Sequence, residues 1–310
     1  METKAIKIKR NRHAKIKRDT SIFQSIATVL GTILLFAECL SVLLPVVWLV
    51  YSSFKPLSEF YMDIWALPRE LKFTNYSRVF EILKITKTTI KGVKQFTIFD
   101  MLGTSFMFTI IPTVIGSLPV VICGYVLGKF TFPGCKFLYA FGIFLMITPI
   151  ISTGAAGLKI AKSFNLYDNP VPNWFLAFQG GFSGVHFLMF YALFKNIPTS
   201  YAEAAMVDGA SNFRIFTQIM FPMATPTWMC VMALNFIGGW NDYTSFLLYY
   251  PSYANLAYGV YYFEAYAQYF NATRTEVFAG FVICMVPSVI VYLLADRFVL
   301  NKFTVGGLKG

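Results

Sequence analysis

The distribution of apolar residues constrains the fold of this 310-residue chain more than any other feature. Hydrophobic residues make up 56% of the chain and charged residues only 13%, whereas about a quarter of residues are charged in soluble domains. The apolar residues gather in blocks long enough for the roughly 20 residues that a helix needs to cross a bilayer. These blocks cover residues 23–51, 104–127, 137–158, 174–194, 220–240 and 277–298. The sequence therefore predicts an all-α integral membrane protein with about six transmembrane helices.

The net charge of +11 is concentrated near the amino terminus. Eight Lys and Arg lie in the first 18 residues, directly before the first apolar block. Such a cluster holds an amino terminus in the cytoplasm, so the charge predicts the orientation of the chain in the membrane. We expect the lipid bilayer to be a partner of this chain, and we expect no nucleic acid partner. With six helices, the cytoplasmic segments carry 15 Lys and Arg and the outer segments carry 11. We expect a multi-pass protein with both termini in the cytoplasm.

The blocks divide the chain into a basic cytoplasmic tail, residues 1–20, and a single transmembrane domain, residues 21–310. A first outer loop covers residues 52–102, and a cytoplasmic loop covers about 195–219. The basic stretch 84–94 interleaves lysines with Ile and Val, which fits either a short amphipathic helix on the membrane surface or a solvated loop. The outer loop 241–276 holds nine of the 18 tyrosines; these fit an interfacial aromatic belt and a docking surface, or stacking on sugar rings.

No set of residues with catalytic or metal-binding spacing can be assembled. The two histidines, His13 and His186, are far apart, and no pair of the five cysteines has the spacing of metal ligands. The phosphate-binding loop Gly-x-x-x-x-Gly-Lys-Ser/Thr is absent, since Gly128-Lys129 is followed by Phe130. We therefore expect no catalytic residue, no metal, no bound cofactor and no ATPase site on this chain.

The cytoplasmic loop before the fifth block has strong helix signals. Ser200 and Glu203 have the spacing of a capping box, which begins a helix. Gly209 is a typical residue directly after a helix end, and Ser211 can cap a second helix, 213–220, that runs into the membrane. Two short helices with a glycine between them and small residues on their surface predict a compact knob (residues 200–220) that docks against another protein.

Within this loop, the pattern Glu203-Ala204-Ala205, three residues, Gly209, nine residues, Ile219, one residue, Phe221-Pro222 resembles the EAA motif of binding-protein-dependent ABC importer permeases. Only Phe221 departs from it, where the family usually has Leu. The resemblance implies the type I ABC importer permease fold in a bacterial or archaeal cytoplasmic membrane. It also implies a second permease subunit, two ATPase subunits that use ATP, and an extracellular solute-binding protein. The implied coupling residues are Glu203, Ala204, Ala205, Asp208, Gly209 and Arg214.

The resemblance covers most of the chain. Leu67-Pro68 followed by Asn75-Tyr76 looks like the start of the family's outer loop, and residues 81–99 look like an insertion in it. The pattern is most similar to the maltose-permease type of inner-membrane subunit, in the carbohydrate branch, which implies a sugar or oligosaccharide as solute and a heterodimer of permeases. For the tail, it implies that Gly306, Gly307 and Lys309 contact the ATPase. Trp240-Asn241-Asp242 looks like the family's signature after its fifth helix, and we expect Asn235, Trp240 and Asn241 to approach the pathway.

Other function classes also fit a multi-helix membrane protein. A stand-alone secondary transporter or channel would have no use for the docking knob, and a membrane-embedded enzyme would need a catalytic set. An ABC permease for a non-sugar solute stays open as well. Glu38 lies near the middle of the first block. Inserting a carboxylate at that depth in a membrane costs on the order of 3 kcal/mol on insertion scales, so we expect Glu38 to be paired or protonated rather than to act in transport.

Overall fold

A computed structural model of the chain describes residues 22–89, 92–148, 153–177, 181 and 184–306. Backbone contacts divide the chain into two units, residues 1–51 and 52–310. The predicted basic tail, 1–20, lies outside the described residues. Helix α2 (Ile22–Ser53) makes up nearly all that is described of the first unit. Its side chains are exposed almost throughout, as expected for an apolar helix whose surroundings are lipid or another membrane helix.

Four helical segments in the described part of the chain are long and apolar enough to cross a membrane. They coincide with four of the predicted blocks, and a shorter apolar helix, α6 (Cys135–Ile147), lies in a fifth. The four segments are Ser25–Ser53 in α2, Ile98–Lys129 (α5), Asn212–Trp240, and Arg274–Arg297 in α15 (Arg274–Gly306). The predicted all-α membrane fold is confirmed.

The predicted blocks 137–158 and 174–194 each contain a helix break. Helix α6 ends before Thr148, whose backbone is extended, because a residue that precedes a proline, here Pro149, disfavours the helical conformation. In the second block, α9 begins at Gly184 with φ +86°, a conformation that glycine adopts without steric cost. Hydropathy does not report such breaks. In place of two long helices, this part of the chain forms α6, α7 (Thr153–Ser163), α8 (Pro170–Leu176) and α9 (Gly184–Asn196).

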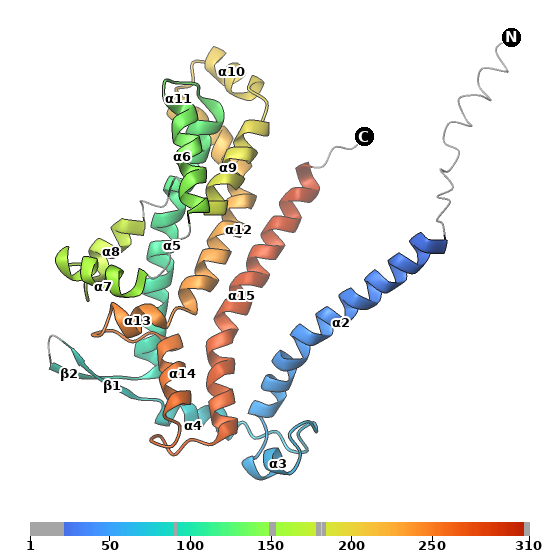
Figure 1. The fold of residues 1–310 in the computed structure, drawn as a ribbon, viewed down its shortest axis with the longest axis vertical. Helices are drawn as coiled ribbons and strands as arrows, with labels where there is room; N and C mark the ends of the chain where they lie inside the picture. The colour runs from blue at the N-terminus through green and yellow to red at the C-terminus, as the bar shows by residue number, and fades with distance from the viewer. Residues whose placement is uncertain (1–21, 90–91, 149–152, 178–180, 182–183, 307–310) are drawn as a thin grey trace. The chain divides into compact units, whose positions relative to one another are not determined.

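Within residues 52–310, α5 is the central helix, and it packs against α9, α8, α14 (Leu256–Ala265) and α12 (Phe221–Trp240). Helix α12 in turn packs along α15 (Figure 1). Gly124 and Gly128 of α5 face α9 at very close range: a Cβ on Gly124 would lie 2.6 Å from the Cβ of Phe190, and one on Gly128 would lie 3.1 Å from the Tyr191 carbonyl oxygen. This spacing of two glycines lets two membrane helices approach closely.

Two apolar cores lie at the two ends of this bundle (Figure 1). At one end, which we call the knob end, α10 (Ser200–Val207) and α11 (Asn212–Ile215) cover a core that includes Phe187, Phe190 and Phe194. At the other end, the hairpin end, α4 (Thr74–Ile82), α13 (Thr244–Leu248), α14 and a β-hairpin surround a core centred on Trp240 and Phe263. Each end therefore has its own packed scaffold on which functional groups can be fixed.

The stretch 84–94 is neither of the predicted alternatives, because most of it forms an antiparallel hairpin of β1 (Ile85–Thr89) and β2 (Gly92–Phe96). Its many β-branched residues favour strand, and Ile85 pairs with Phe96 so that both are buried. The remaining loops also contain helices, including α3 (Leu57–Met62). Of the clustered tyrosines, Tyr250 and Tyr253 pack on Phe108, with ring centroids 5.0 and 5.1 Å away.

Candidate coupling surface and polar junction

The knob, residues 200–220, consists of α10, a tight glycine turn, α11 and a final π-helical turn. The Gly209 N–H donates to the Met206 carbonyl (3.0 Å), and the Ala210 N–H donates to the Ala205 carbonyl (2.9 Å). Gly209 has φ +79°, so this is the turn in which a left-handed glycine ends a helix and satisfies its last carbonyls. The helix end predicted from Gly209 is confirmed.

The two knob helices begin differently. The Ser211 hydroxyl accepts a bond from the Arg214 N–H (3.4 Å), which confirms the predicted cap of the second helix. The predicted capping box of Ser200 and Glu203 is wrong: the residue before α10 is Thr199, its backbone is already helical, and no side chain caps it. The Glu203 N–H instead donates to the Thr199 carbonyl (3.0 Å). The Glu203 carboxylate is therefore not engaged in capping the helix.

The surface of the knob is exposed and partly apolar. Helix α10 has no buried residue among those described, and Met206, Val207 and Phe213 are 50%, 87% and 76% exposed. Glu203 and Asp208 are exposed beside them. Large apolar side chains gathered on one exposed surface and edged by charges mark a contact with another protein. The knob therefore has the character of a docking surface.

The opposite face of the knob is anchored to the bundle. Ile215 and Met220 are buried, and Ala205 and Ala210 pack against the same core. Between the knob and the end of α5 lies a cavity of about 150 Å³, whose lining includes Glu203 and Lys129. The Lys129 ammonium donates to the Ile197 carbonyl, which ties the end of α5 to the segment that leads into the knob. The knob is thereby anchored to the bundle.

A π-helical turn, η3 (Phe216–Met220), joins α11 to α12 in one continuous rod. The Phe221 N–H donates to the Phe216 carbonyl, five residues back. Pro222 has no N–H to offer to the carbonyl of residue 218, which accounts for the wider turn at this point. The Arg214 guanidinium donates to Gln218 along the same rod (2.9 Å). The second half of the knob and α12 thus form one uninterrupted helical segment, Asn212–Trp240, which is long and apolar enough to cross a membrane.

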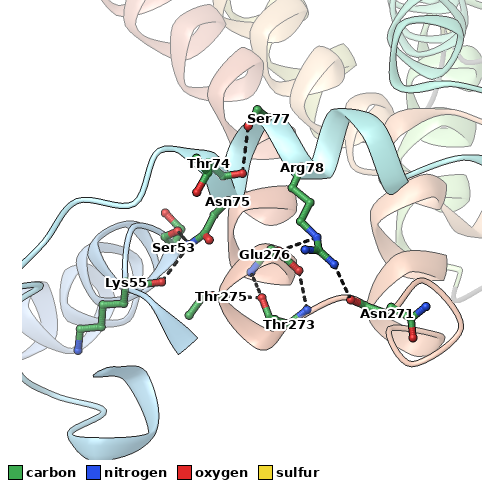
Figure 2. Close-up of polar contacts among 10 residues, drawn as sticks. All are labelled: Ser53, Lys55, Thr74, Asn75, Ser77, Arg78, Asn271, Thr273, Thr275 and Glu276. Atoms are coloured by element: carbon green, nitrogen blue, oxygen red, sulfur yellow. Dashed lines mark hydrogen bonds and ion pairs between the residues drawn. The ribbon is translucent and has the colours of Figure 1, made fainter. Parts of the chain in front are cut away.

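A polar junction at the hairpin end connects α4 to two other parts of residues 52–310 (Figure 2). The Asn75 amide donates to the carbonyls of Ser53 and Lys55, at 2.8 and 3.0 Å. One turn further along α4, the Arg78 guanidinium lies 3.0 Å from the Glu276 carboxylate. The Glu276 side chain is 4% exposed, whereas the Arg78 side chain is 51% exposed. The other Glu276 oxygen accepts from the Thr273 N–H (2.7 Å) and caps the start of α15.

The same junction contains a buried lysine and a partly buried phenol. Lys55 has no exposed surface, and its ammonium donates to the carbonyls of Asp63 and Ile64 (3.0 and 3.2 Å). The Tyr76 hydroxyl bonds to the Ser53 hydroxyl (2.6 Å), and burial raises the pKa of Tyr76 although this bond opposes the shift. Buried polar groups that are fully paired fix one arrangement of the chain. The junction is therefore a rigid support rather than a reactive site.

The residues expected along the pathway occupy different environments. Trp240 is completely buried, and its indole N–H donates to the Cys284 carbonyl of α15 (2.8 Å). The Asn241 amide donates to the Ile237 carbonyl at the end of α12 (2.9 Å), and Asn235 is partly exposed. Of the tail residues, Gly306 is the last residue of α15, and Gly307 and Lys309 lie outside the described residues. The pathway and tail roles stay predictions.

Sequence reasoning missed two of the fixed charges in this structure, Lys87 and Glu276. Both occur in segments taken as loops, where a charge is expected to be solvated. For Glu276 a signal existed, because Thr273-x-x-Glu276 has the spacing of a capping box directly before an apolar run. For Lys87, the alternation of β-branched residues in 85–89 indicated a strand with one inward face, and Lys87 lies on the same face as Ile85.

A bundle of long apolar helices with an exposed, partly apolar knob is the architecture expected of a transporter's membrane subunit. The sequence pattern of the family described as "binding-protein-dependent transport system inner membrane component" matches residues 120–304, more than half of the chain. The chain belongs to this family, as the EAA-like pattern in the knob predicts.

Curated relatives match most of the chain. The diacetylchitobiose uptake system permease of Streptomyces coelicolor is 29% identical over 286 residues, which cover 86% of this chain and 84% of that protein. The trehalose transport system permease of Mycobacterium tuberculosis is 25% identical and covers 86% of this chain and 93% of its own length. The galactooligosaccharides transport system permease of Bacillus subtilis is 23% identical, and the match covers 94% of this chain and 99% of that protein.

The fold also matches a solved structure, that of a bacterial ABC transporter involved in the import of the acidic polysaccharide alginate. The TM-score is 0.65 at 20% identity, with 89% of this chain and 98% of that chain covered. The chain is thus a multi-pass permease subunit of an ABC importer, a transport subunit rather than an enzyme, and it acts within the larger assembly of such an importer.

Proposed function

We propose that this chain is one of two permease subunits that together form the pathway for a sugar or oligosaccharide, which an extracellular solute-binding protein delivers. The relatives named for diacetylchitobiose, trehalose and galactooligosaccharides support this solute class, because each matches over most of its length. In this assembly the ATP is bound and hydrolysed by two partner ATPase subunits, and this chain holds no catalytic residue, metal or cofactor.

The observation that carries the coupling mechanism is the exposed knob fixed to a continuous rod. An ATPase cleft receives the knob through its apolar side chains, while Glu203 supplies a carboxylate that no capping bond occupies. Ala204 and Ala205 permit close approach, the Gly209 turn sets the angle of the two short helices, and Asp208 and Arg214 edge the contact. Movement of the ATPase subunits is then passed through α11 and η3 to α12.

The basic amino terminus supports an orientation with both termini and the knob in the cytoplasm. The hairpin end then faces outward, where the solute-binding protein docks. In this arrangement the polar junction around Asn75 and Glu276 lies at the outer end of the bundle and holds α4 against α15 while the helices move. The carboxyl-terminal tail is then on the cytoplasmic side, and the family pattern implies that Gly306, Gly307 and Lys309 contact an ATPase subunit there.

Uptake by the complete importer tests the proposal. Cells that express this chain with its neighbouring permease, ATPase and solute-binding protein genes are given labelled maltotriose, trehalose, diacetylchitobiose, a dipeptide and a polyol. We expect uptake of at least one of the three sugars, and loss of that uptake when the solute-binding protein gene is deleted. Uptake of the dipeptide alone, or sugar uptake without the binding protein, would contradict the proposal.

A further inference from the structure

The β-hairpin has two distinct faces. In its register, Lys87 pairs with Lys94 and Thr89 pairs with Gly92. Because side chains alternate along a strand, Ile85, Lys87 and Thr89 share one face of β1, and Thr86 and Thr88 share the other. Burial follows this alternation: Ile85 is buried, Lys87 and Thr89 are partly buried, and Thr86 and Thr88 are exposed. The first face is therefore turned toward the rest of the protein.

Lys87 fixes this face against α13, α14 and the segment between them. Its ammonium donates to the Phe246 carbonyl (3.2 Å) and the Tyr253 carbonyl (2.6 Å), and it lies 3.9 Å from the centroid of the Tyr258 ring. Burial lowers the pKa of Lys87 to about 8, and the nearby Asp168 carboxylate opposes that shift. The hairpin is thereby held at a defined position instead of moving as a free loop.

A cavity of about 510 Å³ borders the hairpin, and its lining includes Tyr253, whose carbonyl accepts from Lys87. This volume is within the range of about 300–1,000 Å³ that is typical of small-molecule sites. Three stretches of chain that are far apart in sequence converge on it. The hairpin supplies Thr89, Gly92, Val93 and Lys94, the turn before α8 supplies Asp168, and the segment before α14 supplies Ser252 and Tyr253.

Asp168 is held in place by bonds on both its backbone and its side chain. Its backbone is left-handed, with φ +58°, and its N–H donates to the Tyr249 carbonyl (2.8 Å). One carboxylate oxygen accepts from the Ser252 N–H (2.9 Å), and the residue is 8% exposed. Asp tolerates this left-handed backbone because its short side chain can hydrogen-bond locally, and the bonds to Tyr249 and Ser252 fix where the carboxylate lies.

The groups around the cavity select for a particular ligand chemistry. The Asp168 carboxylate only accepts hydrogen bonds and the Lys94 ammonium only donates them, while the Thr89 hydroxyl donates to the Gly92 carbonyl (2.7 Å). An anionic ligand would meet the fixed Asp168 charge, and a cationic ligand would meet the lysines. A neutral ligand with many hydroxyl groups bonds to both kinds of group at once, and the Tyr253 ring offers it an apolar surface.

We propose that this cavity is a binding subsite for a neutral sugar unit of the transported solute, on the hairpin end of the permease. The assignment rests on the proposed carbohydrate function and adds to it a place where the solute contacts this chain outside its membrane-crossing helices. Asp168 accepts from sugar hydroxyls, Lys94 donates to them, and Tyr253 lies against the ring.

Protection of single cysteines tests the subsite in the complete importer, embedded in lipid nanodiscs. Thr89→Cys places a thiol at the cavity, and Thr88→Cys places a matched thiol on the opposite face of the same strand. Each is labelled with a membrane-impermeant maleimide, with and without maltotriose, diacetylchitobiose or trehalose, and with galacturonate as an anionic probe. We expect a neutral sugar that is also taken up to slow the labelling at position 89 and leave position 88 unchanged.

Asp168→Asn, which preserves shape and can still accept from Ser252, is introduced into the Thr89→Cys protein. We expect the sugar concentration for half-protection to rise about tenfold, the effect of losing one hydrogen bond to a charged group. If a transported sugar gives no protection at position 89, protects position 88 equally, or protects equally well in the Asp168→Asn variant, the subsite is wrong while the sugar function stands. Protection by galacturonate in preference to neutral sugars also overturns it. If none of the sugars is taken up, the proposed function and the subsite fail together.

Discussion

At Gly209 a single residue determines how the two knob helices meet. Its φ of +79° lies in the region that residues with a Cβ rarely adopt, although a Cβ built there contacts no atom within 4 Å. The effect of a substitution is therefore backbone strain and not a clash. Gly209→Val should destabilise the turn by about 1–3 kcal/mol, whereas Gly209→Asn should be milder, because Asn tolerates left-handed backbone.

The measurement for Gly209 is co-purification of the ATPase with the permease. We expect both variants to insert normally, because insertion depends on the apolar helices. Gly209→Val should retain much less ATPase than Gly209→Asn, which should stay close to wild type. Equal retention by the two variants would show that the angle of the knob does not matter for docking.

The charge state of Lys87 should affect folding stability at alkaline pH. Its pKa is lowered from 10.5 to about 8 by burial, so the unfolded chain binds the proton more tightly than the folded chain. Folding stability contributed by this group is then smallest below pH 8, rises as pH increases from about 8 to 10.5, and is constant above that range. Below pH 8, both states carry the proton and the full cost of burying the charge is present.

Thermal unfolding of wild type and Lys87→Met between pH 7 and pH 10.5 tests this sign. Met retains much of the length of the side chain and has no charge to titrate. We expect the melting temperature of wild type to rise with pH relative to that of the variant. If the difference in melting temperature between the two proteins stayed constant with pH, or if wild type fell relative to the variant, Lys87 would not lose a proton in the folded state in this range.

At the scale of elements, the crossing of α5 and α9 is the contact most sensitive to a single methyl group. A Cβ on Gly124 would approach the Phe190 Cβ to 2.6 Å and two backbone atoms to 3.0 Å, and backbone cannot rotate out of the way. Gly124→Ala should therefore destabilise the permease by about 1–3 kcal/mol through overpacking. Gly103→Ala on the same helix, where the Cβ meets nothing within 4 Å, is the matched control.

Thermal stability of the two variants in nanodiscs gives the comparison. Gly103→Ala should be neutral or slightly stabilising, because alanine favours helix over glycine. Gly124→Ala should melt at a clearly lower temperature. If both variants behaved alike, the close approach of α5 and α9 would not be a feature of the folded protein.

Elements were predictable from the sequence where one strong signal acted alone. The long apolar helices followed from length and hydropathy, and the end of α10 followed from Gly209. The breaks at Thr148 and Gly184 did not, because hydropathy averages over a window and does not register a single backbone conformation. The hairpin was missed because its lysines suggested a solvated segment, whereas the alternation of Ile85, Lys87 and Thr89 carried the strand signal.

For the candidate site, the knob and its family pattern were readable, since the motif lies within one short stretch. The Asn75 and Glu276 junction and the cavity at Asp168 were not, because each joins segments that are far apart in the chain. The predicted role of Glu203 as a cap failed for a different, local reason. Backbone bonds from the Thr199 carbonyl begin α10 without it, and no local pattern distinguishes these two ways to start a helix.

At the scale of the whole molecule, the proposed topology places the two ends of the bundle on opposite sides of the membrane. Cysteines introduced at Ser211, in the knob, and at Thr88, in the hairpin, are both at exposed positions. In intact cells, an impermeant maleimide should label the cysteine at 88 and not the one at 211, and permeabilised cells should allow both. Labelling at 211 from outside would reverse the orientation.

The central claim is that ATP hydrolysis by partner subunits drives solute transport, and that the knob transmits the movement of those subunits to the permease. The most direct measurement is sugar uptake into vesicles that contain the complete importer, with and without ATP on the knob side. Wild type and Ser200→Ala, an exposed change in the same helix, should take up sugar only with ATP. Glu203→Ala should reduce that uptake about tenfold or more, because a hydrogen bond to a charged group contributes about 1.5–3 kcal/mol. Uptake at the wild-type rate without ATP, or unchanged uptake by Glu203→Ala, would contradict the account.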